Sequence, residues 1–395
     1  MNALENLLAL PNDQKAARGL VHTPGEIAQQ PATWQSTFEC FRKRRPEISE
    51  FLKAAGIGQG FLRRPTVFLL GAGTSDYIGK SLFQLLRWHW QCEVIAVPST
   101  DLLTHLEECI VPDQRYLWIS FSRSGDSPEG VAVLQKALYD HPEIHHLIVS
   151  CNANGQMIRE IAGKPQALGI CLDDAVNDRG LAMTSSFSNM VVFGQCLAHI
   201  DSPGKYEEVL GELARAGKGF LGAAANCASE LAQGPYTKAC FVGSGALRSA
   251  ASESALKLLE MTAGKIQTMS ESTLGLRHGP MAALNADTLF VCFLSGDDRV
   301  RKYEVDLLEQ IGKKKLVTTR VIVAREWSRQ LGALAEHVVT PGTPFTVADA
   351  YRPPLDAIFG QLLGLFFSIR AGLKPDCPSP NGAISRVVQE VSIYG

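Results

Sequence analysis

The chain has 395 residues, of which 46% are hydrophobic and 20% charged, and its formal net charge is −2. This length allows two or three domains with separate cores, and the near-neutral charge favours neither nucleic acid nor an anionic membrane as a partner. The N-terminal sequence lacks the basic and apolar regions of a secretory signal. The ten cysteines show no zinc-site spacing, so we expect reduced thiols in a cytoplasmic protein.

Residues 1–45 are predicted to form a helical segment in front of the first domain. Thr23, followed by Pro24 and Glu26, is typical of a helix start. Beyond this segment, short apolar runs alternate with longer amphipathic stretches, which indicates a parallel sheet with helices on both faces. The runs expected to be strands are 66–71, 93–98, 116–122, 146–152 and 169–173.

The same pattern then starts again. Residues 239–260 mirror residues 66–86, since each stretch has an apolar strand, a G-x-G turn, small hydroxyl residues and a helix. Further strand-like runs follow this second copy. We therefore predict the α/β class, with two tandem doubly wound parallel-sheet domains of flavodoxin-like type. The predicted segments are the helical residues 1–45, the domains 46–200 and 201–375, and the tail 376–395.

One apolar stretch needs a separate interpretation. Residues 358–372 come closest to the length of a membrane span, but Gln361, Ser368 and Arg370 interrupt them. We predict a buried helix here, and no contact with a membrane.

The turn after the first strand raises the question of a bound phosphate. Gly71 and Gly73 begin a G-x-G turn, which Thr74 and Ser75 follow. A dinucleotide-binding loop needs a third glycine where this chain has Asp76, and no G-K-[ST] follows four residues after the first glycine, as a nucleoside-triphosphate loop requires. The sequence therefore favours neither kind of nucleotide.

The turn after the third strand is richer in polar groups. Hydroxyls, backbone N–H groups and a helix N-terminus together make a compact site for a phosphate monoester. The alternative is that these serines only cap the helix that begins at Pro128. With Thr74 and Ser75 at the neighbouring strand end, the pattern favours the phosphate of a sugar. The polar residues of this turn are Ser122, Arg123, Ser124 and Ser127.

These motifs resemble a known family. "GAGTSDYIG" with "SFSRSGDSPE", repeated as "GSGALRSAASESALKLLE" with "RHGP", are similar to the tandem sugar isomerase (SIS) domains, which also form the isomerase half of glucosamine-6-phosphate synthase. The segments 178–186, 259–280 and 381–391 are most similar to the galactosamine-6-phosphate deaminase/isomerase branch, long described as tagatose-6-phosphate ketose/aldose isomerase. The resemblance covers nearly the whole chain beyond about residue 25.

The resemblance implies roles for individual residues. Glu260 matches the carboxylate that moves a proton between carbons 1 and 2 of the sugar, and Lys257 matches a lysine of the same site. His278 matches the histidine that opens the sugar ring. In family members this histidine can come from the partner subunit, which implies a homodimer with shared sites. The positions that match phosphate-binding residues are Ser75, Ser122, Arg123, Ser124 and Ser127.

Two further expectations concern the sugar and the tail. Thr184 and Ser185 are expected to line the sugar pocket, and the C-terminal tail is expected to close the site. Where the synthase has a lysine that forms an imine, this chain has Arg386. A guanidinium stays protonated and cannot form an imine, so Arg386 is expected to bind substrate oxygens.

The residues alone leave other interpretations open. Glu253, Lys257 and Glu260 share one helix face, and such charges usually form a solvated stripe. His278 could be an ordinary loop histidine. The sequence has no glutaminase domain, so the expected reaction is release of ammonia from D-galactosamine 6-phosphate to give D-tagatose 6-phosphate, without a metal or cofactor. The alternatives are a plain aldose–ketose phosphate isomerase, a glucosamine-6-phosphate deaminase and a non-catalytic phosphosugar-binding regulator.

Overall fold

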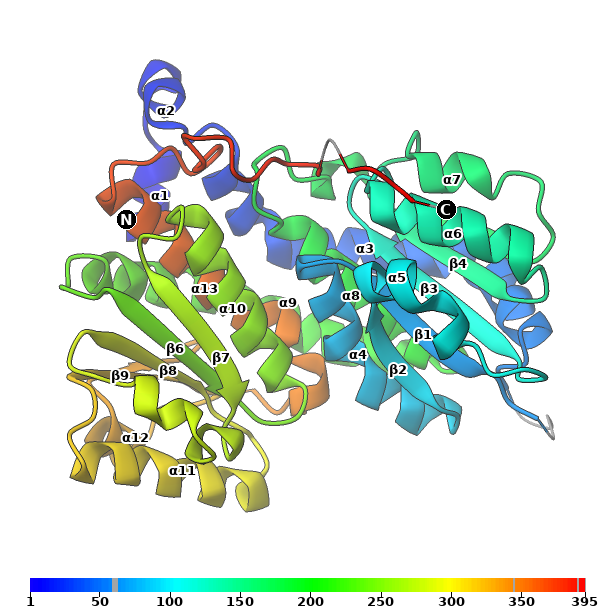
Figure 1. Cartoon of the computed structure of the whole chain (residues 1–395). Helices are drawn as coiled ribbons and strands as arrows, with labels where there is room; N and C mark the ends of the chain where they lie inside the picture. The colour runs from blue at the N-terminus through cyan, green and yellow to red at the C-terminus, as the bar shows by residue number, and fades with distance from the viewer. Residues whose placement is uncertain (59–62, 344, 389–390, 395) are drawn as a thin grey trace. The chain divides into compact units, whose positions relative to one another are not determined.

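Two five-stranded parallel sheets form the framework of the part of the chain that the structure describes. The structure is a computed structural model, and it describes residues 1–58, 63–343, 345–388 and 391–394. The first sheet has the strand order β2-β1-β3-β4-β5 and the second has the order β10-β9-β8-β6-β7. Both orders change direction beside the first strand of the sheet, which is the doubly wound topology. The predicted α/β class with a repeated parallel sheet is confirmed (Figure 1).

The chain groups into two compact units, each of which contains one sheet. The β1–β5 unit consists of Thr33–Asn177, Ser185–Glu207 and the described residues from Ser385 onward. The β6–β10 unit consists of Met1–Ala32, Asp178–Thr184 and Glu208–Ile384.

Helices cover both faces of the first sheet. On one face, Leu102 and Leu106 of α5 and Val133 of α6 pack with Phe68 and Trp118 of the strands. On the other face lie α4 and α8, which pack against each other. The bounds in this unit are β1 Thr66–Gly71, α4 Thr74–Trp90, β2 Val94–Pro98, α5 Ser99–Cys109, β3 Tyr116–Ser122, α6 Pro128–Asp140, β4 His145–Ser150, α7 Gln156–Glu160, β5 Ala167–Cys171, the 3-10 helix Asp174–Val176 and α8 Ser185–Ala198.

The second sheet is covered in the same way. Leu307 of α11 and Leu331 of α12 pack with Cys240 and Phe290 on one face. Helices α10 and α13 lie on the opposite face (Figure 1). The bounds are α9 Pro203–Leu231, β6 Lys238–Gly243, α10 Leu247–Met261, β7 Gln267–Ser272, β8 Thr288–Phe293, α11 Asp298–Lys313, β9 Thr319–Val323, α12 Arg329–Leu334, β10 His337–Val339 and α13 Pro353–Arg370, with 3-10 helices at Gly275–Arg277, Pro280–Ala283 and Asp349–Tyr351.

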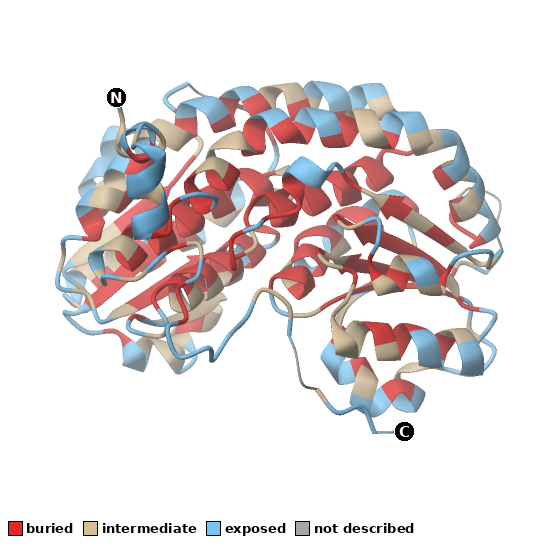
Figure 2. Cartoon of the chain, turned by 90° about the horizontal axis from the view of Figure 1, so that it is seen from above, coloured by how far each residue is buried: buried red, intermediate tan, exposed pale blue. Residues whose placement is uncertain are grey.

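Strand β7 is the one strand of the described chain that the apolar runs do not predict. Its sequence, QTMSES, is mostly polar, and it contains no fully buried residue. It pairs only with β6 and forms the edge of the sheet. An edge strand needs less apolar surface than a central one, so its pattern does not stand out. The central strands, by contrast, are buried on both faces (Figure 2).

The N-terminal segment is helical, as predicted, but its last helix is longer than expected. The helices are α1 Ala3–Leu8, α2 Asn12–Arg18 and α3 Thr23–Ala54. Helix α3 starts at Thr23 and runs through residue 45 without a break, because Ile48 and Leu52 continue its buried side. The predicted boundary after residue 45 therefore falls inside a helix.

The apolar stretch near the C-terminus forms the buried helix α13, as predicted. Among the described residues, no helix combines the length and apolar character that a membrane span requires. All ten cysteines are free thiols.

Candidate active site

The G-x-G turn after β1 brings the first turn of α4 onto the end of the strand. A Cβ on Gly71 would lie 2.4 Å from the carbonyl carbon of Ser75, so only glycine allows this approach. Gly73 has a φ of +57°, a left-handed conformation that glycine adopts without strain. The turn after β6 has the same geometry at Gly243 and Gly245. The repeated motif therefore builds the same strand–turn–helix unit twice.

The turn after β3 folds back on itself through its own hydroxyl groups. The amide of Gly125 donates to Ser122 Oγ at 3.0 Å. The amide of Asp126 donates to Ser124 Oγ at 3.1 Å, and the Asn152 side chain donates to the Ser124 carbonyl at 2.8 Å. A hydroxyl that accepts a bond still carries one proton to donate. The turn therefore gathers hydroxyl groups around Gly125, beside the end of β1, with which β3 pairs.

The loop after β4 packs against this turn and forms hydrogen bonds with it. A Cβ on Gly155 would lie 2.6 Å from the Ser124 carbonyl oxygen, so a glycine is required for the contact. The Asp126 carboxylate accepts the amide of Gln156 at 2.8 Å. Sequence reasoning missed Asn152 and Gly155. Their signal is the Asn-x-x-Gly stretch directly after a buried strand, a typical turn sequence.

The serines of this turn do not cap helix α6. Ser127 occupies the N-cap position, but its hydroxyl donates to Glu129 at 2.9 Å and makes no capping bond to the helix backbone. Helix α4 likewise has no side-chain cap at Gly73. Both helix N-termini lie at the carboxyl edge of the sheet, where the helix dipole favours an anion. The interpretation of these serines as mere helix caps is therefore not supported.

Arg386 of the tail lies against the same turn. Its backbone carbonyl accepts a hydrogen bond from the buried Arg123 guanidinium, and its own guanidinium donates to Asn177 Oδ1 at 2.6 Å. Sequence reasoning placed both arginines at the substrate, and the structure brings them together. Gln389 and Glu390, at the end of the tail motif, lie outside the described residues.

The loop 178–186 is held by its own acidic residue. Asp178 accepts the amide of Thr184 at 2.7 Å and its hydroxyl at 2.9 Å. Thr184 and Ser185 are fully buried. The hydroxyl of Thr184 thus fixes the loop, and the predicted contact of these two residues with the sugar gains no support from the structure.

Glu26 is an acidic residue near this loop that sequence reasoning did not assign to the site. Its carboxylate accepts the amide of Gly180 at 3.2 Å. Burial, reinforced by the charge of Asp178, raises the pKa of Glu26 to about 7. Its only sequence signal is the helix start at Thr23.

Helix α10 carries a buried ion-pair network. Lys257 Nζ lies 2.6 Å from a carboxylate oxygen of Glu260 and 3.5 Å from one of Glu253. The side chains of Glu253 and Lys257 are 0% and 1% exposed, whereas that of Glu260 is 23% exposed. The solvated stripe that spacing alone suggests is therefore wrong. Lys257 is held by an acid on each side, and Glu260 is the member of the network that reaches solvent.

The position of this network depends on two glycines of α13. A Cβ on Gly360 would lie 2.2 Å from Ser254 Oγ, and one on Gly364 would lie 3.0 Å from the Lys257 carbonyl oxygen. The two helices therefore approach closely only because α13 has glycine at these positions. This contact determines where α10 presents Lys257 and Glu260.

His278 lies on the surface of the β6–β10 unit. It ends the 3-10 helix Gly275–Arg277 and is followed by Gly279 with a φ of +118°. Its side chain is exposed. The structure thus brings Lys257 and Glu260 together in one unit and the two serine-containing turns together in the other.

Comparison with known proteins identifies the family. No protein-family model matches the chain. An Escherichia coli protein named D-galactosamine-6-phosphate deaminase AgaS is 32% identical over 385 residues, which cover 94% of this chain and 95% of that protein. A Streptomyces coelicolor protein, named provisionally for the same activity, is 38% identical over 98% of this chain and 97% of its own length. The chain belongs to the AgaS family.

Solved structures agree with membership of the AgaS family. The crystal structure of tagatose-6-phosphate ketose/aldose isomerase from Escherichia coli matches with a TM-score of 0.84 and 30% identity, over 94% of this chain and 96% of that one. A Clostridium novyi structure, provisionally described as the same kind of isomerase, matches with a TM-score of 0.91 and 27% identity over 96% of each chain. These structures confirm the SIS-type fold that the motifs predict.

Proposed function

We propose that the protein is an amino-sugar-phosphate deaminase that converts D-galactosamine 6-phosphate and water to D-tagatose 6-phosphate and ammonia. The observation that carries the proposal is the full-length relation to proteins named D-galactosamine-6-phosphate deaminase. The buried Lys257–Glu260 pair on α10 supports it, since a plain binding module needs no acid held in this way. The reaction breaks a C–N bond with water, so the enzyme is a hydrolase with aldose–ketose isomerase chemistry.

The substrate phosphate is proposed to bind at the carboxyl edge of the first sheet. Hydroxyl donors, two uncapped helix N-termini and an arginine suit a dianionic phosphate monoester. The edge also lies beside the point where the strand order reverses, which is where doubly wound sheets bind ligands. The residues assigned to this role are Thr74, Ser75, Ser122, Arg123, Ser124 and Ser127, with Arg386 contacting substrate oxygens.

His278 is proposed to open the sugar ring. An imidazole titrates near neutral pH and can pass a proton between the anomeric hydroxyl and the ring oxygen. Its exposure in the chain agrees with a contribution to the site of a partner subunit in a homodimer.

Glu260 is proposed to move the proton that converts the aldose to the ketose form. Its carboxylate removes the proton on carbon 2 of the open-chain amino sugar, and the resulting enolamine takes that proton back on carbon 1. Lys257, 2.6 Å from Glu260, holds the carboxylate in place through a charge-assisted hydrogen bond. The product is a ketimine, which water hydrolyses to the ketose phosphate and ammonia.

Ammonia release from a panel of hexosamine 6-phosphates tests the proposal. We expect galactosamine 6-phosphate to be the preferred substrate and Glu260→Gln to lower kcat by about 10²- to 10⁴-fold, the usual contribution of a general acid–base. Substrate binding, measured by calorimetry, should persist in this variant. The matched control is Glu309→Gln, which changes an exposed Lys–Glu helix pair and should leave kcat unchanged.

Other outcomes identify the alternatives. Turnover of tagatose 6-phosphate without ammonia release from any amino sugar would mean a plain isomerase, and preference for glucosamine 6-phosphate would mean the other deaminase. Binding without turnover of any substrate would mean a regulator. Mixing Glu260→Gln with His278→Ala subunits should restore part of the activity, because one mixed site then has both groups. No restoration would contradict the shared homodimeric site.

The protein is also proposed to act in the cytoplasm, as the ten free thiols suggest. Cell fractionation checks this location, and recovery with the membranes or outside the cell would contradict it.

A further inference from the structure

The β6–β10 unit contains a pocket that the proposed reaction does not use. It has a volume of about 200 Å³ and lies at the carboxyl ends of β8 and β9. Its floor is apolar, formed by Leu294, Ala324 and Leu331 of the core under α11 and α12. Because α10 lies on the opposite face of this sheet, the pocket is separate from Lys257 and Glu260 (Figure 1).

The wall of the pocket is polar, and its Ser295 hydroxyl already donates to Asp349. Arg301 from α11 and Arg325 from the end of β9 contribute two guanidinium groups, against the single carboxylate of Glu326. Ser328 and Gln330 add a hydroxyl and an amide. Guanidinium groups bind phosphate oxygens through pairs of N–H donors, so this wall suits a phosphate group.

Existing contacts hold both arginines in place without using all their donors. Arg325 donates to the Gly296 carbonyl at 2.7 Å and to the Thr346 carbonyl at 3.4 Å. Arg301 pairs with Asp298, whose side chain is 80% exposed. Since each guanidinium carries five N–H donors, both retain donors for a ligand. A pre-positioned guanidinium loses less side-chain entropy when it binds.

An exposed tryptophan, Trp327, lies between two pocket residues in the chain, although its own side chain is not part of the pocket lining. The Trp327 side chain is 63% exposed. Its two neighbours in the chain, Glu326 and Ser328, both line the pocket. Its ring lies over α12, since a Cβ on Gly332 would come within 3.4 Å of it. Exposed tryptophan is uncommon in folded chains, and a flat aromatic face beside polar side chains suits the C–H face of a sugar.

We propose that this pocket is a second ligand site, which takes the phosphate group of a small phosphorylated sugar and places the sugar against Trp327. The volume is below the usual range for larger ligands, so the pocket takes the phosphate end rather than a whole nucleotide. Glu326 and Gln330 accept hydrogen bonds from sugar hydroxyls. The site goes beyond the proposed function, because it uses none of the residues assigned to catalysis.

Calorimetry on the Glu260→Gln chain tests the proposal, because this variant is expected to bind galactosamine 6-phosphate without consuming it. We expect two binding events per chain. Arg301→Ala and Gln330→Ala, made separately, should each raise the Kd of one binding event and leave the other unchanged. For Arg301→Ala we expect a rise of about 10-fold or more. Inorganic phosphate should compete for both events, and free galactosamine should bind to neither.

The matched control is Arg299→Ala on the same turn of α11. Arg299 is 89% exposed and does not line the pocket, so both events should persist. A single event per chain, or a second event that neither Arg301→Ala nor Gln330→Ala changes, would overturn the proposal. The result is independent of the proposed reaction, since two events without ammonia release by the unaltered chain would support this site and contradict the deaminase function.

Discussion

The turns after β3 and β8 occupy the same place in the two sheets, yet their donors have different partners. The β3 turn carries the hydroxyls of Ser122 and Ser124 beside the Asp126 carboxylate, and neither neighbouring helix has a side-chain cap. In the β8 turn, Asp349 accepts the Gly296 amide at 2.9 Å and the Ser295 hydroxyl at 2.5 Å. Glu304 accepts the Ser295 amide at 2.7 Å. The second copy of the turn is therefore filled by carboxylates of the chain itself.

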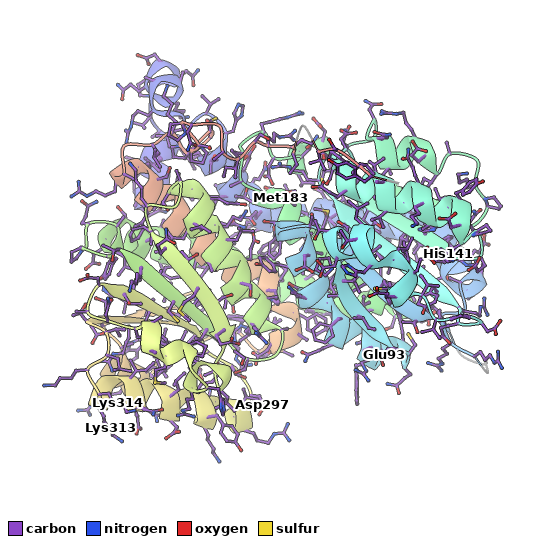
Figure 3. All side chains as sticks on the ribbon, in the orientation of Figure 1. Glu93, His141, Met183, Asp297, Lys313 and Lys314 are labelled. Atoms are coloured by element: carbon purple, nitrogen blue, oxygen red, sulfur yellow. The ribbon has the colours of Figure 1, made fainter. Side chains whose placement is uncertain are left out.

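Further charged groups lie around the β8 turn and the start of α11. Asp297, which Figure 3 labels, caps α11 by accepting the Arg299 amide at 2.8 Å. The fully buried Arg352 pairs with Asp349 at 2.9 Å and with Asp356 at 2.8 Å. Burial raises the pKa of Glu304 above its ordinary value. In the β8 turn, carboxylates of the chain thus take the donors of Ser295 and Gly296, and the pocket between Arg301 and Arg325 lies beside these satisfied groups.

The largest expected effect comes from removing a carboxylate of the β8 turn. Asp349→Asn leaves Arg352, which is 0% exposed, with one carboxylate partner instead of two. We expect the free energy of unfolding to fall by about 3 kcal/mol, because a buried charge loses part of its compensation. Urea unfolding measures the change. Asp298→Asn, at a side chain that is 80% exposed, is the control and should change stability very little.

The KM for the sugar phosphate should change little in Asp349→Asn, since Asp349 is not among the residues assigned to the reaction. Equal stability of the two variants would contradict the role given to Asp349.

A smaller effect is expected when the β3 turn is made more acidic. Ser124→Asp places a carboxylate where the β3 turn has a hydroxyl, so it repels the substrate phosphate and removes a donor. We expect KM for galactosamine 6-phosphate to rise about 100-fold, which corresponds to about 2.7 kcal/mol. Ser124→Ala removes only the donor and should raise KM about 10-fold. Steady-state kinetics distinguish these values, and similar KM values for all three proteins would show that the β3 turn does not bind phosphate.

The smallest effect is the pH dependence that Asp356 gives to the free energy of unfolding. Burial raises the pKa of Asp356 from its ordinary value of 3.8 to about 6. Between these two values the unfolded chain has lost a proton that the folded chain keeps, so rising pH favours unfolding through this window. This group should lower the free energy of unfolding by about 2 kcal/mol between pH 4 and pH 7.

Urea midpoints of the unaltered chain and of Asp356→Asn, measured across this pH range, isolate the contribution. The difference between the two proteins should shift steadily in favour of the variant as the pH rises. Parallel curves would show that Asp356 titrates at its ordinary pKa.

The local pattern of the sequence was enough to predict the repeated α/β architecture. Central strands buried on both faces appear as apolar runs, and a G-x-G turn requires glycine for reasons that lie within a few residues, as at Gly71 and Gly243. The polar edge strand β7 was not predicted, because none of its residues is fully buried and it therefore lacks an apolar run. The hydroxyl-rich turn at 122–127 was also visible, because all its groups are adjacent in the chain.

Only the tertiary structure decided that carboxylates take the donors of the β8 turn and which acids are buried. The carboxylate that fills the β8 turn comes from a residue 54 positions away, and no local pattern links Asp349 to Ser295. Likewise, the spacing of Glu253, Lys257 and Glu260 suits a solvated face, yet in the fold the first two are buried. Helix α13 approaches α10 at Ser254 and the Lys257 backbone through Gly360 and Gly364, which are far from α10 in the sequence. Neighbours in the chain determine backbone conformation, whereas burial and the pairing of charges depend on groups that only folding brings together.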